Sequence, residues 1–312
     1  MKILSRPKKN AEEYGKWAVN PYVGCSNQCE YCYLRKGPSG KYLGQDHPVL
    51  KKGVVSNDHA YHLAMTEIIE HKDEIIRDGG LFFTFTSDPC LPTTCDLTYH
   101  IAADAMNYGI PVTLLTKNAD SYYGMENPSV QLFTVACQVD SWLTRIAIFK
   151  NTYQKSLAIG FTLTGRDDLE PLASSNQKRI NVLKHLNGKG WITWASIEPV
   201  IDFGSSFRMI QQALDAGCRH FKIGLMTERT KVCRSGFTLG GKTFEPYDPA
   251  RCLAFVQDVM QQTRDRATVY WKQSFRDFIG GTGKHRLFSD DELHKIFDDY
   301  PNAVGKDWSM FE

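Results

Sequence analysis

Short runs rich in β-branched and aromatic residues alternate with amphipathic helical stretches through the first two thirds of the chain. Strands are predicted at 17–23, 81–86, 110–115, 158–163, 191–197 and 220–224. Helices are predicted between them at 60–77, 102–107, 177–186 and 207–216. Such alternation is typical of parallel strands joined by right-handed helical crossovers. We therefore predict an α/β fold, a partial (β/α)6 barrel of parallel strands, with ligands at the C-terminal ends of the strands.

Two stretches fall outside this alternation. Residues from about 122 to 155 are interpreted as an insertion between the third and fourth units. Residues 226–312 are interpreted as an irregular extension that packs on a barrel formed by residues 1–225, with a helix at 249–263 and a short strand at 268–271.

Composition narrows the class of protein further. Lys and Arg number 37 against 35 Asp and Glu, giving a net charge of +2, so no global field attracts the chain to nucleic acid or to an anionic membrane. The sequence has no long apolar run and no signal peptide pattern, which favours a cytoplasmic protein without a membrane partner. Nine cysteines, an odd number, favour reduced thiols with a metal or redox role over a disulfide framework.

Three of these cysteines form a C-x3-C-x2-C triplet directly after the first predicted strand: Cys25, Cys29 and Cys32. A structural zinc site usually takes four ligands in two pairs, and no second pair follows, although His47 or His59 could supply a fourth ligand. Three thiolates on one loop also fit a [4Fe-4S] cluster that leaves one iron without a protein ligand. Such an open iron can bind a chelating small molecule.

The triplet, with Tyr31 before its last cysteine and its place after the first strand, resembles that of the radical S-adenosylmethionine superfamily. The resemblance implies two cofactors, a [4Fe-4S] cluster and S-adenosylmethionine, whose amino and carboxylate groups chelate the free iron. It also implies that one electron, from a reductant such as flavodoxin or ferredoxin, cleaves the sulfonium bond, and that the resulting 5′-deoxyadenosyl radical abstracts hydrogen from a substrate.

Segments 29–34 and 86–89 are similar to the spore photoproduct lyase-like branch of that superfamily. The Ser-x-Glu-Pro segment 196–199, together with 270–273, also resembles uncharacterised phage-associated radical S-adenosylmethionine proteins. Applied to the ends of the predicted strands, the resemblance implies binding roles. The residues expected to contact S-adenosylmethionine are Tyr31, Ser87, Asp88, Lys117, Thr162, Thr164, Arg179 and Glu198.

Several of these roles are implied in detail. Ser87 and Asp88 would receive the amino group of the cofactor, Lys117 would face its carboxylate, and Thr162 with Thr164 would lie near the ribose. Arg179 has two open roles, because its fork can bind a carboxylate of the ligand or form an ion pair with a buried Glu170.

One position departs from the lesion-repair lyases, which carry a hydrogen-donor cysteine close to the Ser-Asp segment. Phe85 and Thr86 stand there instead, which argues against photolesion repair. The nearest thiol after the segment is Cys90, which is either a catalytic thiol at the mouth of the barrel or a small buried hydrophobic residue.

The substrate is the least constrained part of the prediction. Aromatic and basic residues cluster at 33–36 and 270–276, a mixture that can stack bases and neutralise phosphates. With the resemblance, this makes nucleic acid a candidate substrate, for repair or modification. The alternatives are a peptide or small metabolite as substrate, or a non-catalytic module that binds zinc or an electron-transfer cluster.

Overall fold

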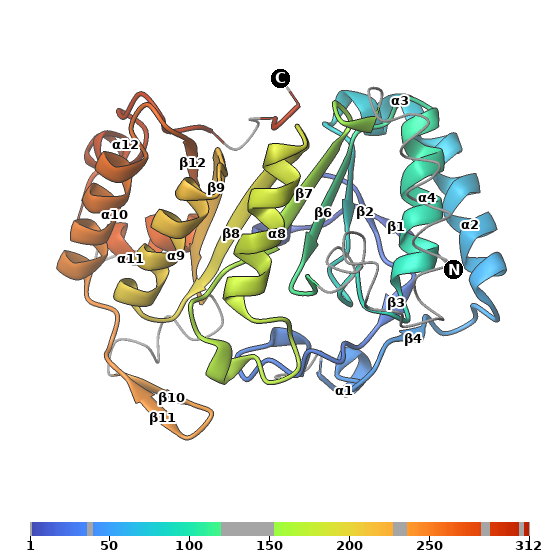
Figure 1. The fold of residues 1–312 in the computed structure, drawn as a ribbon, viewed down its shortest axis with the longest axis horizontal. Helices are drawn as coiled ribbons and strands as arrows, with labels where there is room; N and C mark the ends of the chain where they lie inside the picture. The colour runs from blue at the N-terminus through green and yellow to red at the C-terminus, as the bar shows by residue number, and fades with distance from the viewer. Residues whose placement is uncertain are drawn as a thin grey trace.

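An eight-stranded sheet runs through the computed structural model, which describes residues 2–35, 40–119, 153–226, 236–281, 288–305 and 309–311 (Figure 1). The strand order is β1-β2-β5-β6-β7-β8-β9-β12. The strands are β1 (Leu4–Ser5), β2 (Ala18–Val19), β5 (Leu81–Phe83), β6 (Val112–Thr116), β7 (Leu157–Thr162), β8 (Ile192–Val200), β9 (His220–Leu225) and β12 (Thr268–Trp271). Only β1 is antiparallel to its neighbour within this sheet. The predicted fold class is therefore confirmed.

The first predicted strand is divided in two. Asn20 and Pro21 separate β2 from β3 (Tyr22–Val23), which leaves the sheet and pairs in antiparallel fashion with β4 (Val49–Leu50). Pro21 cannot donate a ladder hydrogen bond, and the side chain of Asn20 instead accepts from the Phe85 amide at 2.7 Å. After this break the chain leaves the main sheet at the C-terminal end of β2 and continues into the cysteine triplet.

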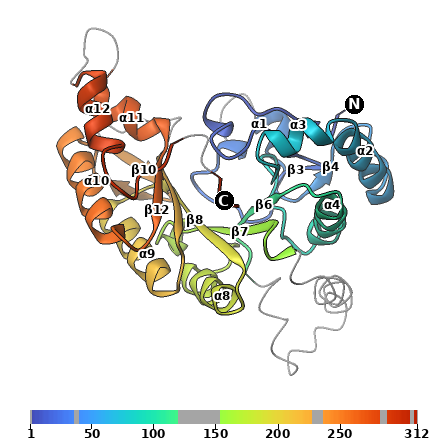
Figure 2. The same ribbon diagram turned by 90° about the horizontal axis from the view of Figure 1, so that it is seen from above.

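Helices cover the outside of the curved sheet (Figure 2). They are α2 (Asn57–Glu70), α3 (Lys72–Arg77), α4 (Cys95–Asn107), α8 (Asn176–Gly188), α9 (Phe203–Asp215), α10 (Pro249–Thr263), α11 (Gln273–Gly280) and α12 (Asp290–Phe297), with a short α1 (Gly40–Leu43). The one helix predicted at 60–77 is two helices, because the turn at His71 interrupts it. The main hydrophobic core lies between these helices and the sheet.

The sheet continues past the six predicted units. β12 pairs in parallel with β9, so the strand predicted at 268–271 is an integral part of the sheet. The small hairpin of β10 (Phe237–Leu239) and β11 (Lys242–Phe244) lies at the lower edge of Figure 1. A division of the chain at residue 225 stays a prediction, and the predicted insertion lies outside the described residues up to position 152.

The N-terminal segment joins the two halves of the sheet. Just before it enters β2, Glu13 accepts hydrogen bonds from the Tyr270 hydroxyl at 2.9 Å and from the Gln273 amide at 2.7 Å. The Lys222 ammonium on β9 donates to the Glu13 carbonyl at 2.8 Å. Because β2 and β12 lie toward opposite ends of the strand order, these bonds link the two sides of an open barrel.

Inside the curve, large side chains fill the barrel. Trp194 lies so close to β7 that a Cβ atom on Gly160 would sit 2.1 Å from its Cε2, which explains the glycine in the middle of a strand. Met310, near the C-terminus, packs with Trp194 and Phe82.

Candidate active site

A cavity of about 910 Å³ opens at the C-terminal ends of the parallel strands. Its walls come from the segments that follow β3, β5, β6, β8 and β12, together with Thr162 at the end of β7. Because parallel strands end at the same edge of a sheet, side chains far apart in sequence meet there, as the sequence predicts. The predicted site residues that line it are Cys25, Cys29, Cys32, Tyr31, Ser87, Asp88, Lys117, Thr162 and Glu198.

Backbone contacts hold the cysteine loop in place. Gly24 has a φ of +87°, and a Cβ atom there would lie 2.5 Å from Gln45 Cβ, so only glycine fits. The Cys25 amide donates to the Gln45 carbonyl at 3.1 Å, and the Glu30 amide donates to the Leu169 carbonyl at 2.9 Å. The loop is therefore anchored at both ends, and all three thiols line one cavity.

The thiols are close enough to influence one another. Burial raises the pKa of Cys25 to about 12, with a contribution from the Asp88 charge. Burial raises the pKa of Cys29 to about 11, while the nearby Lys117 ammonium acts in the opposite direction. Thiolates at these positions therefore need positive charge beside them.

Three thiols on one loop that line one cavity are compatible with a cluster. Within the described ranges, no three His, Cys, Asp or Glu side chains gather closely enough to hold one metal ion. A cluster places a separate iron at each thiolate, so it does not need three sulfurs to converge on one point.

Two further groups fit the predicted cofactor. Ser87 Oγ is buried at the cavity and makes no hydrogen bond with any described residue. The Lys117 ammonium lies 5.5 Å from the centre of the Tyr31 ring, and no acid in the described part of the chain forms an ion pair with it. Burial lowers the pKa of Lys117, but the charges of Cys29 and Glu170 outweigh this and raise it overall, so the group stays cationic. An unpartnered hydroxyl and an unpaired cation are suited to a zwitterionic ligand.

Asp88, in contrast, is already fully engaged. Its Oδ2 accepts hydrogen bonds from the Asn27 side chain at 2.9 Å and from the Lys117 amide at 2.8 Å. Its Oδ1 accepts from the Thr116 hydroxyl at 2.5 Å and from the Cys90 amide at 2.9 Å. These four bonds tie the cysteine loop to the ends of β5 and β6, so the structure gives this carboxylate an organising role.

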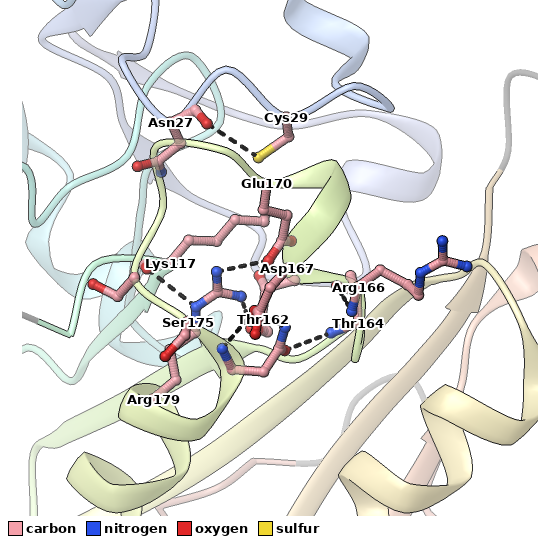
Figure 3. A network of polar contacts seen from close by, with 12 residues as sticks. Asn27, Cys29, Lys117, Thr162, Thr164, Arg166, Asp167, Glu170, Ser175 and Arg179 are labelled. Carbon is pink, nitrogen blue, oxygen red and sulfur yellow. Dashed lines mark hydrogen bonds and ion pairs between the residues drawn. The ribbon is translucent and has the colours of Figure 1, made fainter. Parts of the chain in front are cut away.

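Arg179 is also a connecting residue (Figure 3). Its guanidinium is completely buried and donates to the Glu170 carboxylate at 2.6 Å, to the Thr162 carbonyl at 2.8 Å and to the Lys117 carbonyl at 3.1 Å. Tyr31 donates its hydroxyl to the same carboxylate. Of the two roles left open by the sequence, the ion pair with Glu170 is the one present, and Arg179 does not line the cavity.

Two other predicted residues lie away from the cavity. Thr164 is completely buried beyond the end of β7, where its amide donates to Asn176, so of the threonine pair only Thr162 reaches the cavity. Cys90 is completely buried in the main hydrophobic core. A catalytic thiol at position 90 is therefore not what the structure shows, because Pro89 and the turn held by Asp88 direct the chain inward.

A polar network at the other half of the cavity was only partly foreseen. Glu198 Oε2 accepts from the Lys272 ammonium at 2.7 Å and from the Tyr14 hydroxyl, which also lies 2.8 Å from Ser196 Oγ. Lys272 lay in a segment that the sequence singled out, whereas no local pattern marked Tyr14. Burial and the Glu198 charge hold the pKa of Tyr14 well above its usual value, so the phenol stays protonated.

The fold and the site define an open α/β barrel whose strand-end cavity carries three thiols, a lysine that forms no ion pair with a described acid, and a buried acid–base network. Among solved structures, spore photoproduct lyase in complex with a dinucleoside spore photoproduct has a similar fold, with a TM-score of 0.54 and 16% sequence identity. The match covers 86% of this chain and 80% of that one. The expected resemblance is thus confirmed at the level of the fold.

Sequence comparison adds an uncharacterised protein of Methanocaldococcus jannaschii, which is 26% identical over 200 residues. That match spans 60% of this chain and 61% of the archaeal protein. No protein-family model matches the chain. None of the described helices is both long and apolar enough to cross a membrane.

Proposed function

We propose that this protein is a radical S-adenosylmethionine enzyme that acts on nucleic acid. Cys25, Cys29 and Cys32 would hold a [4Fe-4S] cluster, and Ser87 and Lys117 would receive the amino and carboxylate groups of S-adenosylmethionine. The observation that carries the proposal is the meeting, in one cavity, of three thiols with a hydroxyl and an ammonium that have no hydrogen-bond or ion-pair partner among the described residues.

When bound, the cluster and S-adenosylmethionine would supply a carbon-centred radical that takes hydrogen from the substrate. The protein's own residues bind, orient and shield. Asp88 fixes the cysteine loop against the ends of β5 and β6, and Arg179 fixes the ends of β6 and β7. Thr162, whose carbonyl is held by Arg179, lies at the cavity where the ribose is expected.

The cavity also supports a substrate as large as a nucleotide beside the cofactor, since about 910 Å³ is at the upper end of small-molecule sites. Spore photoproduct lyase, which shares the fold, was solved in complex with a dinucleoside spore photoproduct. Among the cysteines in the described part of the chain, only the triplet lines this cavity. Phe85 and Thr86 stand before the Ser-Asp segment, where the lesion-repair lyases carry a cysteine, which favours modification of a nucleic acid or a repair step with another hydrogen donor.

The central test is anaerobic reconstitution with iron and sulfide. We expect close to four irons and four sulfides per chain and, under dithionite, formation of 5′-deoxyadenosine from S-adenosylmethionine. Cys29→Ala should abolish both, whereas Cys252→Ala, which changes a thiol on α10 outside the cavity, should leave both unchanged. A correctly folded protein that binds one zinc and no sulfide would contradict the proposal.

The nucleic-acid part has its own test. Filter binding of a short oligonucleotide over a salt series should show affinity that falls steeply as salt rises, because phosphate contacts release counterions. Affinity that does not depend on salt, or no binding, would favour a peptide or a small metabolite as substrate.

A further inference from the structure

The β8–β12 half of the cavity contains a built polar subsite, formed by Tyr14, Ser196, Glu198 and Lys272. The side chains of Glu198 and Lys272 are 16% and 2% exposed, and their ion pair spans 2.7 Å. No described hydrogen bond joins these residues to the cysteine loop, and only Glu198 among them was expected from the sequence to contact S-adenosylmethionine. A buried ion pair is costly to assemble for stability alone, so its place in a ligand cavity calls for a functional reason.

The charges around this subsite balance. Behind it, Glu13 Oε2 lies 3.6 Å from the Lys272 ammonium, and Lys222 donates to the Glu13 carbonyl. Two acids therefore face two ammonium groups. Because no net charge remains, the subsite favours neither a phosphate nor a free cation, and suits a neutral polar group.

Glu198 retains one acceptor for such a group. Its Oε2 is occupied by Lys272 and Tyr14, whereas its Oε1 forms no hydrogen bond with any described residue. Gly224 on β9 leaves the space that this oxygen occupies, since a Cβ atom there would lie 2.8 Å from it. Lys272 has three N–H groups and two acidic partners, which leaves one donor for a ligand. The pair thus offers an acceptor next to a donor.

The neighbouring wall is aromatic. Phe85 stacks on Phe82 with 4.6 Å between ring centroids, and the Tyr14 ring lies 5.5 Å from Phe82. All three residues line the cavity. Flat aromatic surfaces of this kind bind planar rings.

We propose that this subsite binds the edge of a planar, neutral heterocycle that presents an N–H beside a C=O, as a lactam or imide nucleobase does. Glu198 accepts from the N–H, Lys272 donates to the carbonyl, and Phe85 contacts the face of the ring. The phosphates of the nucleic-acid substrate stay at the mouth of the cavity, which Lys8 and Lys9 help to line. This inference rests on the proposed function and names the part of the substrate that the cavity selects, a base taken out of its stack.

Binding of free nucleosides to the reconstituted protein tests the inference by calorimetric titration. Uridine carries the N–H, and 3-methyluridine differs only by a methyl group in its place. We expect 3-methyluridine to bind about 10- to 100-fold more weakly, because a hydrogen bond to a charged acceptor is lost. Glu198→Gln should reduce the difference to about threefold or less, since Gln is a neutral acceptor. Equal binding of the two nucleosides, or no binding of uridine, would overturn the inference.

The matched control is Asp298→Asn, which alters the 2.7 Å ion pair with Arg276 away from the cavity and should keep the full preference. A folded Glu198→Gln protein that keeps the full preference would overturn the role of Glu198. If that variant does not fold, the comparison of the two nucleosides on the wild type decides by itself. Iron, sulfide and 5′-deoxyadenosine are measured on the same sample, so an active protein that does not discriminate refutes this inference and leaves the proposed function standing.

Discussion

Replacing Arg179 with methionine separates the two roles that its sequence position allows. The change removes a fully buried guanidinium that donates to Glu170, to the Thr162 carbonyl and to the Lys117 carbonyl. Glu170 would remain as a buried charge with only the Tyr31 hydroxyl as a donor among the described side chains. The removal of one partner from a buried ion pair costs about 3 to 5 kcal/mol, and the two carbonyls add to this.

We therefore expect Arg179→Met to lower the free energy of unfolding by about 4 kcal/mol or more. For a chain of 312 residues, this corresponds to a fall in Tm of about 6 °C. Differential scanning calorimetry of the cluster-free protein measures it without interference from ligand binding. The double change Arg179→Met with Glu170→Leu should recover part of the loss, because it removes the stranded charge.

One result would contradict a structural role for Arg179. If Arg179→Met unfolds within about 1 kcal/mol of the wild type, yet no longer binds S-adenosylmethionine, then the guanidinium serves the cofactor and does not hold the strand ends together.

Three further changes test other parts of the structure. Gly224→Ala should disturb the Glu198–Lys272 pair, because its Cβ atom would lie 2.8 Å from Glu198 Oε1. Nucleoside binding should weaken at least fivefold in calorimetric titration while the iron content stays the same. Unchanged binding would contradict this expectation. Burial and Arg219 lower the pKa of His220 to about 4, so the folded state resists protonation of this side chain. As the pH falls from 6.5 toward 4, the free energy of unfolding of the wild type should therefore fall by about 2 kcal/mol relative to that of His220→Gln. The same pH dependence of unfolding in both proteins would refute this. Asp88→Ala should at least halve the iron retained after gel filtration, although it alters no thiol, because the Asn27 and Lys117 contacts are lost; full retention would show that the loop holds itself.

The sequence by itself determined the order of parallel strands and the place of the thiols. The strands predicted at 110–115, 158–163 and 220–224 are found as β6, β7 and β9 within one or two residues at each end, because apolar periodicity and β-branched content are local properties. The spacing of Cys25, Cys29 and Cys32 keeps the three thiols on one short loop, and all three line one cavity. The chemistry of the strand ends followed from the same regularity.

What the side chains at those ends do was decided only by the tertiary structure. Asp88 and Arg179 carry the charges expected of ligand-binding groups, but partners distant in sequence use up their hydrogen-bonding capacity. Cys90 is buried because the turn before α4 directs it inward, and Tyr14 reaches the cavity because Glu13 fastens the N-terminal segment to β12. Whether a side chain is buried, and whether its hydrogen bonds are satisfied, depends on which distant segments contact it in the folded protein. The spacing of residues along the sequence does not show those contacts.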